Sequence, residues 1–112
     1  VGLGHDFLRH IERTRFLLFV IDMAGSEGRS PVEDFRTLRE ELRLYNPDLA
    51  KRPYEILANK MDEPAAKENL KVFRREIRRK PLELCAVLGE GVPALKTRLF
   101  KWFFPEDPLL EI

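Results

Sequence analysis

The segment 56–62, which reads I-L-A-N-K-M-D, combines a short apolar run with side chains that can bind a ligand. Its first three residues are apolar, and Asn59, Lys60 and Asp62 follow almost at once. An apolar run that stops abruptly at polar residues is typical of a buried strand whose carboxyl end opens into a ligand crevice. We therefore predict a binding site at these three polar side chains.

The chemistry of the three side chains favours guanine as the ligand. A carboxylate such as that of Asp62 can accept two parallel hydrogen bonds from a ring N–H and an exocyclic amine, and guanine presents this pair whereas adenine does not. Asn59 can donate to guanine O6 or N7, and the stem of Lys60 can lie across the base with its charge in solvent. The same residues also fit a polar strand-to-helix turn in which Asp62 caps the following helix.

The composition is that of one globular domain. The 112 residues are 44% hydrophobic and 35% charged with a formal net charge of +1, so no charge bias indicates a nucleic-acid or membrane-binding protein. The single cysteine, Cys85, excludes an internal disulfide and suits a reducing compartment. The longest apolar run is too short to span a bilayer, and no basic-then-apolar leader precedes it. We expect a cytoplasmic protein, with an organelle matrix as the alternative.

The hydrophobic pattern predicts an α/β fold. We expect strands at 16–23, 54–58 and 82–85 and helices at 2–13, 31–45, 64–79 and 92–104, followed by a short acidic tail at 105–112. Helices that alternate with strands point to right-handed crossovers and a parallel sheet with helices on both faces. The nearly continuous apolar run from Phe16 to Met23 predicts a central strand covered on both faces.

Two predicted loops fall at the same edge of this sheet. The loop with Asn59, Lys60 and Asp62 follows the second strand, and the loop 85–89 follows the third. The carboxyl ends of parallel strands lie on one side, so the two loops can share a ligand. This agreement favours a nucleotide site over a plain turn.

A basic face on the third predicted helix leads to a second hypothesis. Apolar residues form a stripe at helical spacing, and the far side carries Lys67, Lys71, Arg74, Arg75 and Arg78. Such a face can contact RNA phosphates, which suggests a catalytically inactive RNA- or partner-binding module. A solvated helix face on a structural fragment without a ligand is the third interpretation.

Four motifs in the same order resemble the GTPase domain of the Obg family. They are G-L-G-H-D-F-L-R-H-I-E-R-T-R at 2–15, V-I-D-M-A-G at 20–25, N-P-D-L at 46–49 and A-N-K-M-D at 58–62. In that family the first segment follows the switch II region, and N-K-x-D reads the guanine base. The resemblance implies that residues 1–112 are the second half of a P-loop GTPase domain, from the end of the switch II helix to the last helix.

The family's second guanine-contacting loop, S-A-x-T-G-E-G, corresponds here to C-A-V-L-G-E-G at 85–91. The resemblance implies that the backbone N–H of Ala86 contacts guanine O6, and it extends the guanine-binding set to Cys85, Ala86 and Val87. Cys85 replaces the usual serine and Leu88 the threonine. Because a thiol is a poor hydrogen-bond donor, we expect a looser loop and a lower affinity.

The phosphate-binding motif of the family does not occur in this sequence. The 112 residues contain no G-x-x-x-x-G-K-[ST], and the nearest approach, G-S-E-G-R-S at 25–30, has the wrong spacing and lacks the lysine. The resemblance thus implies GTP or GDP as the ligand, with Mg²⁺ only when the missing phosphate-binding half is present. It implies neither a catalytic residue nor a metal ligand in this chain, which alone should read guanine weakly and not hydrolyse GTP.

The resemblance also implies partners. Obg proteins are large-ribosomal-subunit assembly factors, so ribosomal RNA of that subunit is an expected partner, whereas a membrane is not. The family places the strand between Phe16 and Met23 beside a first strand that this chain lacks, which leaves an open sheet edge. We expect that edge to pair with the missing amino-terminal half or with a second copy.

Overall fold

The computed structural model describes residues 4–85 and 89–103. In chain order the elements are α1 (His5–Ile11), β1 (Leu17–Asp22), η1 (Ser26–Gly28), α2 (Pro31–Tyr45), α3 (Pro47–Ala50), β2 (Tyr54–Asn59), α4 (Ala66–Ile77), β3 (Leu82–Glu83) and α5 (Val92–Phe103). The predicted α/β fold is confirmed. The predicted tail, 105–112, lies outside the described residues.

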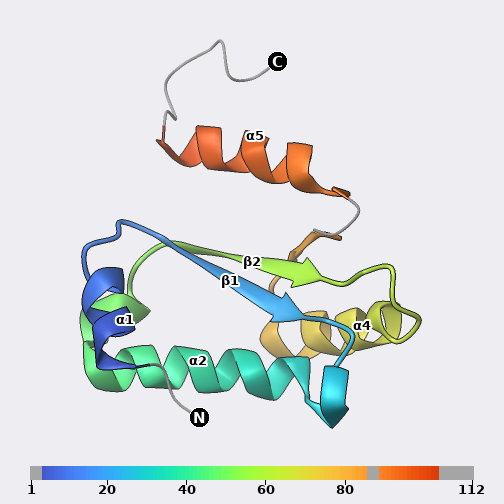
Figure 1. Cartoon of the computed structure of the whole chain (residues 1–112), viewed down its shortest axis with the longest axis horizontal. Helices are drawn as coiled ribbons and strands as arrows, with labels where there is room; N and C mark the ends of the chain where they lie inside the picture. The colour runs from blue at the N-terminus through green and yellow to red at the C-terminus, as the bar shows by residue number, and fades with distance from the viewer. Residues whose placement is uncertain (1–3, 86–88, 104–112) are drawn as a thin grey trace.

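Three parallel strands form the sheet in the order β1-β2-β3. β1 pairs with β2 along its whole length, from Leu17 opposite Tyr54 to Asp22 opposite Asn59. The pairing of β3 with β2 is much shorter and begins with Leu82 opposite Leu57. Figure 1 shows β1 and β2 ending on the same side of the molecule. Side chains that end these strands therefore meet at one edge of the sheet.

Helices lie on both sides of the sheet, but only the side of α2 and α4 is closely packed. α2 and α4 lie on one face and α5 on the other (Figure 1). On the first face the rings of Phe19 and Phe35 pack edge to face with centroids 5.3 Å apart, and Phe35 contacts Phe73 at 5.6 Å. On the second face Arg98 of α5 forms an ion pair at 3.4 Å with Glu55, which is 8% exposed. The aromatic cluster on the first face makes up the centre of the core.

The local sequence explains where α2 begins and ends. The Ser30 hydroxyl accepts a hydrogen bond from the backbone N–H of Glu33 at 3.2 Å, and Pro31 occupies the first turn. At the other end the side chain of Asn46 accepts the N–H of Asp48 at 3.0 Å and starts α3. The sequence pattern predicts only the end of the helix 31–45 here, so α3 is an additional helix. No helix in the described part of the chain is long and apolar enough to cross a bilayer.

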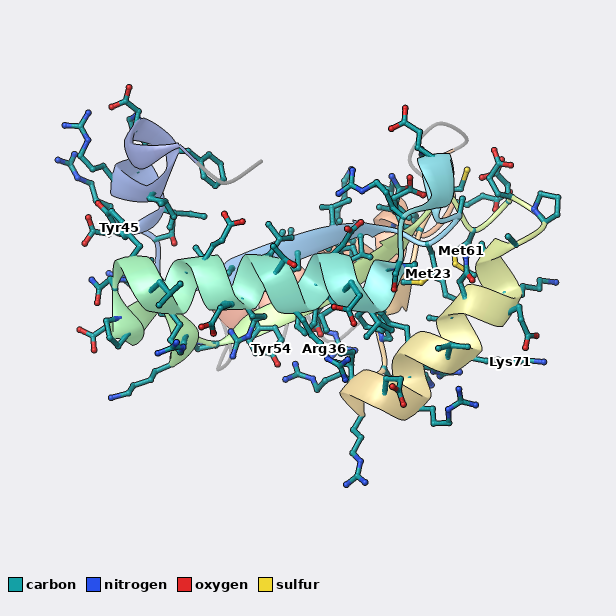
Figure 2. The ribbon with its side chains drawn as sticks, turned by 90° about the horizontal axis from the view of Figure 1, so that it is seen from below. Met23, Arg36, Tyr45, Tyr54, Met61 and Lys71 are labelled. Atoms are coloured by element: carbon teal, nitrogen blue, oxygen red, sulfur yellow. The ribbon has the colours of Figure 1, made fainter. Side chains whose placement is uncertain are left out.

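The first helix packs against the carboxyl-terminal end of α2. Glu12, just after α1, accepts hydrogen bonds from the Tyr45 hydroxyl at 2.9 Å and from the Asn46 side chain at 3.1 Å. Figure 2 shows Tyr45 where α2 approaches α1. Leu8 joins the buried core at 6% exposure. α1 is shorter than the predicted helix 2–13, of which residues 2 and 3 lie outside the described part.

The position of β1 corrects the prediction of a central strand covered on both faces. Within the described residues β1 pairs only with β2 and lies at the edge of the sheet. Its residues alternate between buried positions such as Phe19 and exposed positions such as Leu18 and Val20, which are 39% and 55% exposed. The exposed residues of β1 are apolar as well, and no described segment covers the face that they form. Among the described strands β1 is therefore the edge strand, at the position where the family resemblance leads us to expect an open edge.

An apolar groove with a volume of about 350 Å³ runs along this open edge. Phe7 and Ile11 of α1, Leu18 and Val20 of β1, and Leu38 of α2 contribute to its lining. An edge strand presents backbone N–H and C=O groups to any strand that arrives beside it. Apolar side chains around such an edge increase its tendency to associate.

We predict that the chain self-associates as its concentration rises and that Val20→Lys prevents this. A lysine on the edge strand disfavours pairing, and the exposed position keeps the effect on the free energy of unfolding within about 0.5 kcal/mol. Light scattering after size-exclusion chromatography measures the molar mass of the parent chain and of the variant in solution. Leu44→Lys, at a position on α2 that is 68% exposed, adds the same charge and should leave association unchanged. A parent chain that remains monomeric at high concentration would contradict the prediction.

Candidate functional site

The two loops predicted to share a ligand meet at the carboxyl edge of the sheet. Asn59 ends β2, Lys60 and Asp62 follow it, and Cys85 lies two residues beyond β3. Backbone hydrogen bonds hold the two segments together, from the N–H of Leu84 to the Ala58 carbonyl at 2.8 Å and from the N–H of Met61 to the Leu84 carbonyl at 3.3 Å. The other two predicted guanine-binding residues, Ala86 and Val87, lie outside the described residues.

The thiol of Cys85 contacts the carboxylate of Asp62 directly. The sulfur lies 3.1 Å from Oδ1 of Asp62, with the thiol as the donor. Cys85 is only 3% exposed, and its backbone exchanges hydrogen bonds of 2.9 and 3.1 Å with Glu90. The thiol therefore reaches the carboxylate as a serine hydroxyl would, although it is a weaker donor. One oxygen of Asp62 is thus held by the segment that follows β3.

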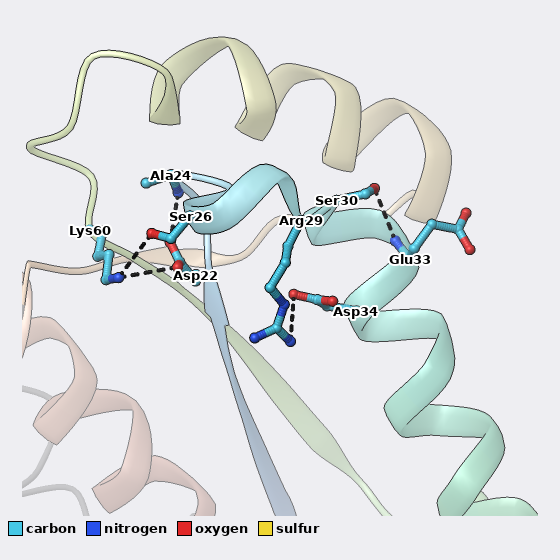
Figure 3. Close-up of polar contacts among 8 residues, drawn as sticks. All are labelled: Asp22, Ala24, Ser26, Arg29, Ser30, Glu33, Asp34 and Lys60. Atoms are coloured by element: carbon cyan, nitrogen blue, oxygen red, sulfur yellow. Dashed lines mark hydrogen bonds and ion pairs between the residues drawn. The ribbon is translucent and has the colours of Figure 1, made fainter. Parts of the chain in front are cut away.

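Lys60 reaches across the sheet edge to the loop after β1. Its backbone has a φ of 63°, and its Nζ lies 3.1 Å from Oδ2 of Asp22 and 3.1 Å from the hydroxyl of Ser26 (Figure 3). A positive φ at a residue other than glycine is uncommon, and among the described residues Lys60 shares it with Glu27 and Arg78. The sequence predicts that the charge of Lys60 lies in solvent. The side chain is 46% exposed, but its charge is paired with Asp22.

Asp22 and Ser26 are site residues that the sequence pattern did not predict. One sequence feature could have indicated Asp22, because it ends an apolar strand just as Asn59 does. Parallel strands place their carboxyl ends at the same edge of the sheet. The pairing with Lys60 depends on the register of β1 against β2. We call Asp22, Ser26 and Lys60 the lysine clamp.

The carboxylate of Asp22 is strongly hydrogen bonded. Its Oδ1 accepts the backbone N–H of Ala24 at 3.0 Å, while Oδ2 accepts from Lys60. Burial by itself raises the pKa of Asp22, but hydrogen bonds from Ser26, Lys60 and Ala24 outweigh that effect and hold the pKa below its ordinary value of 3.8. The Asp22 carboxyl is therefore ionised at neutral pH.

Gly25 allows the loop after β1 to turn close to its neighbours. Its φ is 66°, and a Cβ at this position would lie 2.8 Å from the Arg29 carbonyl oxygen and 3.2 Å from the Asn69 side chain. The Asn69 amide donates to the Met23 carbonyl at 2.9 Å and so ties the loop to α4. Within the segment G-S-E-G-R-S, the nearest approach to a phosphate-binding loop, Ser26 contacts Lys60.

The basic face proposed on the third predicted helix is exposed in the structure. It lies on α4 and the residue that follows it, and its members are Lys67, Lys71, Arg74, Arg75 and Arg78. Only Lys71 among them is near a carboxylate in the described part of the chain, with its Nζ 3.8 Å from Glu68. Within residues 4–85 and 89–103, no group of three His, Cys, Asp or Glu side chains is arranged to hold a metal ion.

We predict that Lys60→Met raises the pKa of Asp22. The parent carboxyl should titrate below 3.8, and loss of the lysine removes a hydrogen bond and a positive charge that favour the ionised form. Because the folded-state pKa is lowered, the stabilisation by the clamp is present above the unfolded-state pKa and is lost as the pH falls through the lower folded-state value. A carbon NMR titration of Asp22 measures the pKa. A parent value at or above the ordinary one would contradict the assignment.

Comparison with known proteins identifies the family of the chain. No family model matches it. Three curated relatives, each named GTPase Obg, come from Akkermansia muciniphila, Syntrophomonas wolfei and Bacillus cereus; they are 52%, 51% and 47% identical over 88%, 89% and 100% of this chain. The chain spans only 28%, 24% and 27% of these relatives. The matched segments run through both loops of the site and nearly the whole fold, and the chain therefore belongs to the Obg family as a counterpart of part of those proteins.

Proposed function

We propose that this chain is the guanine-reading part of an Obg-type GTP-binding protein. The observation that carries the proposal is the contact between Cys85 and Asp62, which joins the loops after β2 and β3 at the carboxyl edge of a parallel sheet. Ligands of open α/β sheets bind at this edge. The position of the N-K-x-D residues at this edge supports the proposal, as does the contact from Cys85 after β3, which a simple turn would not require.

The arrangement suits hydrogen bonding to guanine. The Asp62 carboxylate accepts from the N1–H and the exocyclic amine of the base, while the Cys85 thiol holds one of its oxygens in place. Asn59 donates to O6 or N7. The family resemblance implies a further donor to O6, the backbone N–H of Ala86, and it places Val87 in the same guanine-binding set. The lysine clamp holds the Lys60 stem at the mouth of the crevice.

In this proposal the chain by itself recognises the guanine base but does not bind or hydrolyse the phosphates. Its 112 residues contain no phosphate-binding loop motif, and Ser26, in the segment nearest to that motif, is used in the lysine clamp. Phosphate contacts supply much of the affinity for a nucleotide, so we expect a dissociation constant on the order of millimolar. We propose that Mg²⁺ and GTP hydrolysis require the phosphate-binding half of the domain, of which residues 1–112 are the remainder.

The open edge of β1 is the proposed docking site for that half. The apolar groove beside it, with Phe7 and Val20 in its lining, offers both backbone groups and apolar area to an arriving strand. A second copy of the chain competes for the same edge when the other half is absent. We further propose that the parent protein acts in the cytoplasm on ribosomal RNA of the large subunit, as the family resemblance implies.

We predict that the chain binds GDP in preference to ADP. GDP at millimolar concentrations should shift the backbone NMR signals of Lys60, Asp62 and Cys85, because these residues surround the base. ADP at the same concentrations should leave them unchanged, since adenine lacks the N1–H and the amine at C2. GTP turnover by the pure chain should not exceed that of buffer. Equal shifts with both nucleotides, or no shift with GDP even when the phosphate-binding half is added, would refute the proposal.

We predict that Asp62→Asn moves the preference from guanine toward xanthine. An asparagine amide donates to the C2 carbonyl of xanthine but cannot accept the two N–H groups of guanine as a carboxylate does. The ratio of XDP to GDP affinity should rise by about tenfold or more, which competition NMR measures. Asp48→Asn makes the same charge change at an exposed position on α3 and should leave the ratio unchanged. An unchanged ratio for Asp62→Asn means that Asp62 does not read the base.

A further inference from the structure

The sheet carries a buried carboxylate that the guanine site does not use. Of the charged residues in the described part of the chain, only Glu55 of β2 is buried, at 8% exposure. Its neighbour Ile56 belongs to the core that residues of α2 and α4 share. Because successive side chains of a strand point to opposite faces, Glu55 faces the other side, where α5 lies (Figure 1). A carboxylate buried there costs free energy unless a counter-ion pairs with it.

Arg98 of α5 supplies the counter-ion. Its Nε lies 3.4 Å from Oε2 of Glu55, and the arginine and glutamate side chains are 49% and 11% exposed. The pair is therefore open to solvent at the guanidinium and buried at the carboxylate. Solvent screening keeps the attraction modest, but loss of the arginine would leave a buried carboxylate unpaired. The two charges thus hold α5 against β2.

The remaining contact between α5 and the sheet is loose. A cavity of about 390 Å³ lies between the helix and β3, lined by Leu82 of the strand and by Ala94, Thr97 and Arg98 of the helix. The three helix residues are exposed and do not fill it. The direction of α5 therefore depends on individual points of attachment more than on close packing.

The first point of attachment is at the amino end of α5. Gly91, just before the helix, has a φ of 84°, and a Cβ there would lie 2.2 Å from the carbonyl oxygen of Glu83. Only a glycine allows so close an approach. The chain thus passes directly against β3 before the helix starts at Val92.

This attachment is continuous with the proposed base-reading loop. The backbones of Cys85 and Glu90 exchange hydrogen bonds of 2.9 and 3.1 Å, and the Cys85 thiol donates to Asp62 at 3.1 Å. Glu90 directly precedes Gly91. A rotation of α5 about Gly91 would therefore strain the hydrogen bonds between Cys85 and Glu90 and move the thiol away from the carboxylate.

The ion pair is the second point of attachment. Arg98 lies beyond Val92 by about 9 Å along the helix axis. A helix that is held only at its first turn can rotate about that turn, whereas a second attachment fixes its direction. Glu55 belongs to the same strand that ends in Asn59, so α5 is tied to the strand that presents the N-K-x-D residues.

We propose that the ion pair of Glu55 and Arg98 positions the guanine-reading loop by fixing the direction of α5. Both are positioning residues, which act through the helix and the hydrogen bonds between Cys85 and Glu90. This role rests on the proposed function, because it concerns the same guanine site. Loss of Arg98 alone leaves the Glu55 carboxylate buried without a counter-ion and releases α5. Replacement of both residues by apolar side chains removes the charge together with its partner.

The first test measures how fast Cys85, the single cysteine, reacts with iodoacetamide. The thiol is 3% exposed, and Arg98→Met should make it react about fivefold faster, because release of α5 opens the loop more often. Glu55→Leu combined with Arg98→Met should bring the rate back near that of the parent. Arg43→Met is the matched control; it breaks an ion pair with Glu40 at a similarly exposed arginine and should leave the rate unchanged.

The second test measures the GDP affinity of the same proteins by NMR, with ADP as the control ligand. Arg98→Met should weaken GDP binding by about fivefold, and the double variant should restore it. Thermal unfolding shows whether each variant folds. If Arg98→Met does not fold, Glu55→Gln takes its place: it removes the ion pair but buries a neutral amide, so it should produce smaller changes in the same direction.

A thiol rate that the single variant leaves unchanged, or that the double variant fails to restore, overturns the proposal. A faster thiol reaction with unaltered GDP affinity means that α5 does not position the guanine site, which also overturns it. If the parent chain binds no GDP even with the phosphate-binding half added, the proposed function fails instead. The thiol rates of the single and double variants then decide by themselves whether the ion pair positions the loop.

Discussion

The in-register parallel pairing of β1 with β2 is the interaction on which the other features depend. It sets Asp22 opposite Asn59 at one end and Leu17 opposite Tyr54 at the other. At the carboxyl end this register brings Asp22 within reach of Lys60. A shift of one residue would turn the side chains of β1 to the opposite face, so the core and the lysine clamp are determined by the same hydrogen bonds.

The two ends of the sheet have different chemistry because different loops and helices converge there. At the carboxyl end, Asp62 receives a hydrogen bond from Cys85, and Lys60 pairs with Asp22 and Ser26, so the polar groups of the proposed base-reading site lie at that edge. At the amino end, Arg39 and Arg79 both contact Tyr54 and create a cationic surface. One short strand thus separates a carboxyl end with paired acidic and basic groups from an amino end where two arginines contact one tyrosine.

Stability and positioning are supplied by different contacts in this fold. The edge-to-face packing of Phe19, Phe35 and Phe73 lies in the buried core, where each aromatic pair contributes about 0.5–1.5 kcal/mol beyond its buried area. The ion pair of Asp22 with Lys60 is partly exposed, and pairs of that kind contribute at most about 1 kcal/mol. The clamp therefore matters for where the Lys60 side chain lies more than for the free energy of folding.

The sequence by itself determined the features that depend on near neighbours. The cap at Ser30 with Pro31 located the start of α2, alternating helices and strands indicated the parallel sheet, and Asn59 to Asp62 marked the carboxyl edge as the site. Only the tertiary structure showed that β1 leaves Val20 exposed, that Lys60 pairs with Asp22, and that Arg39 and Arg79 meet at Tyr54. These contacts join residues far apart in the chain, and their partners depend on strand register and helix packing, which local patterns do not specify.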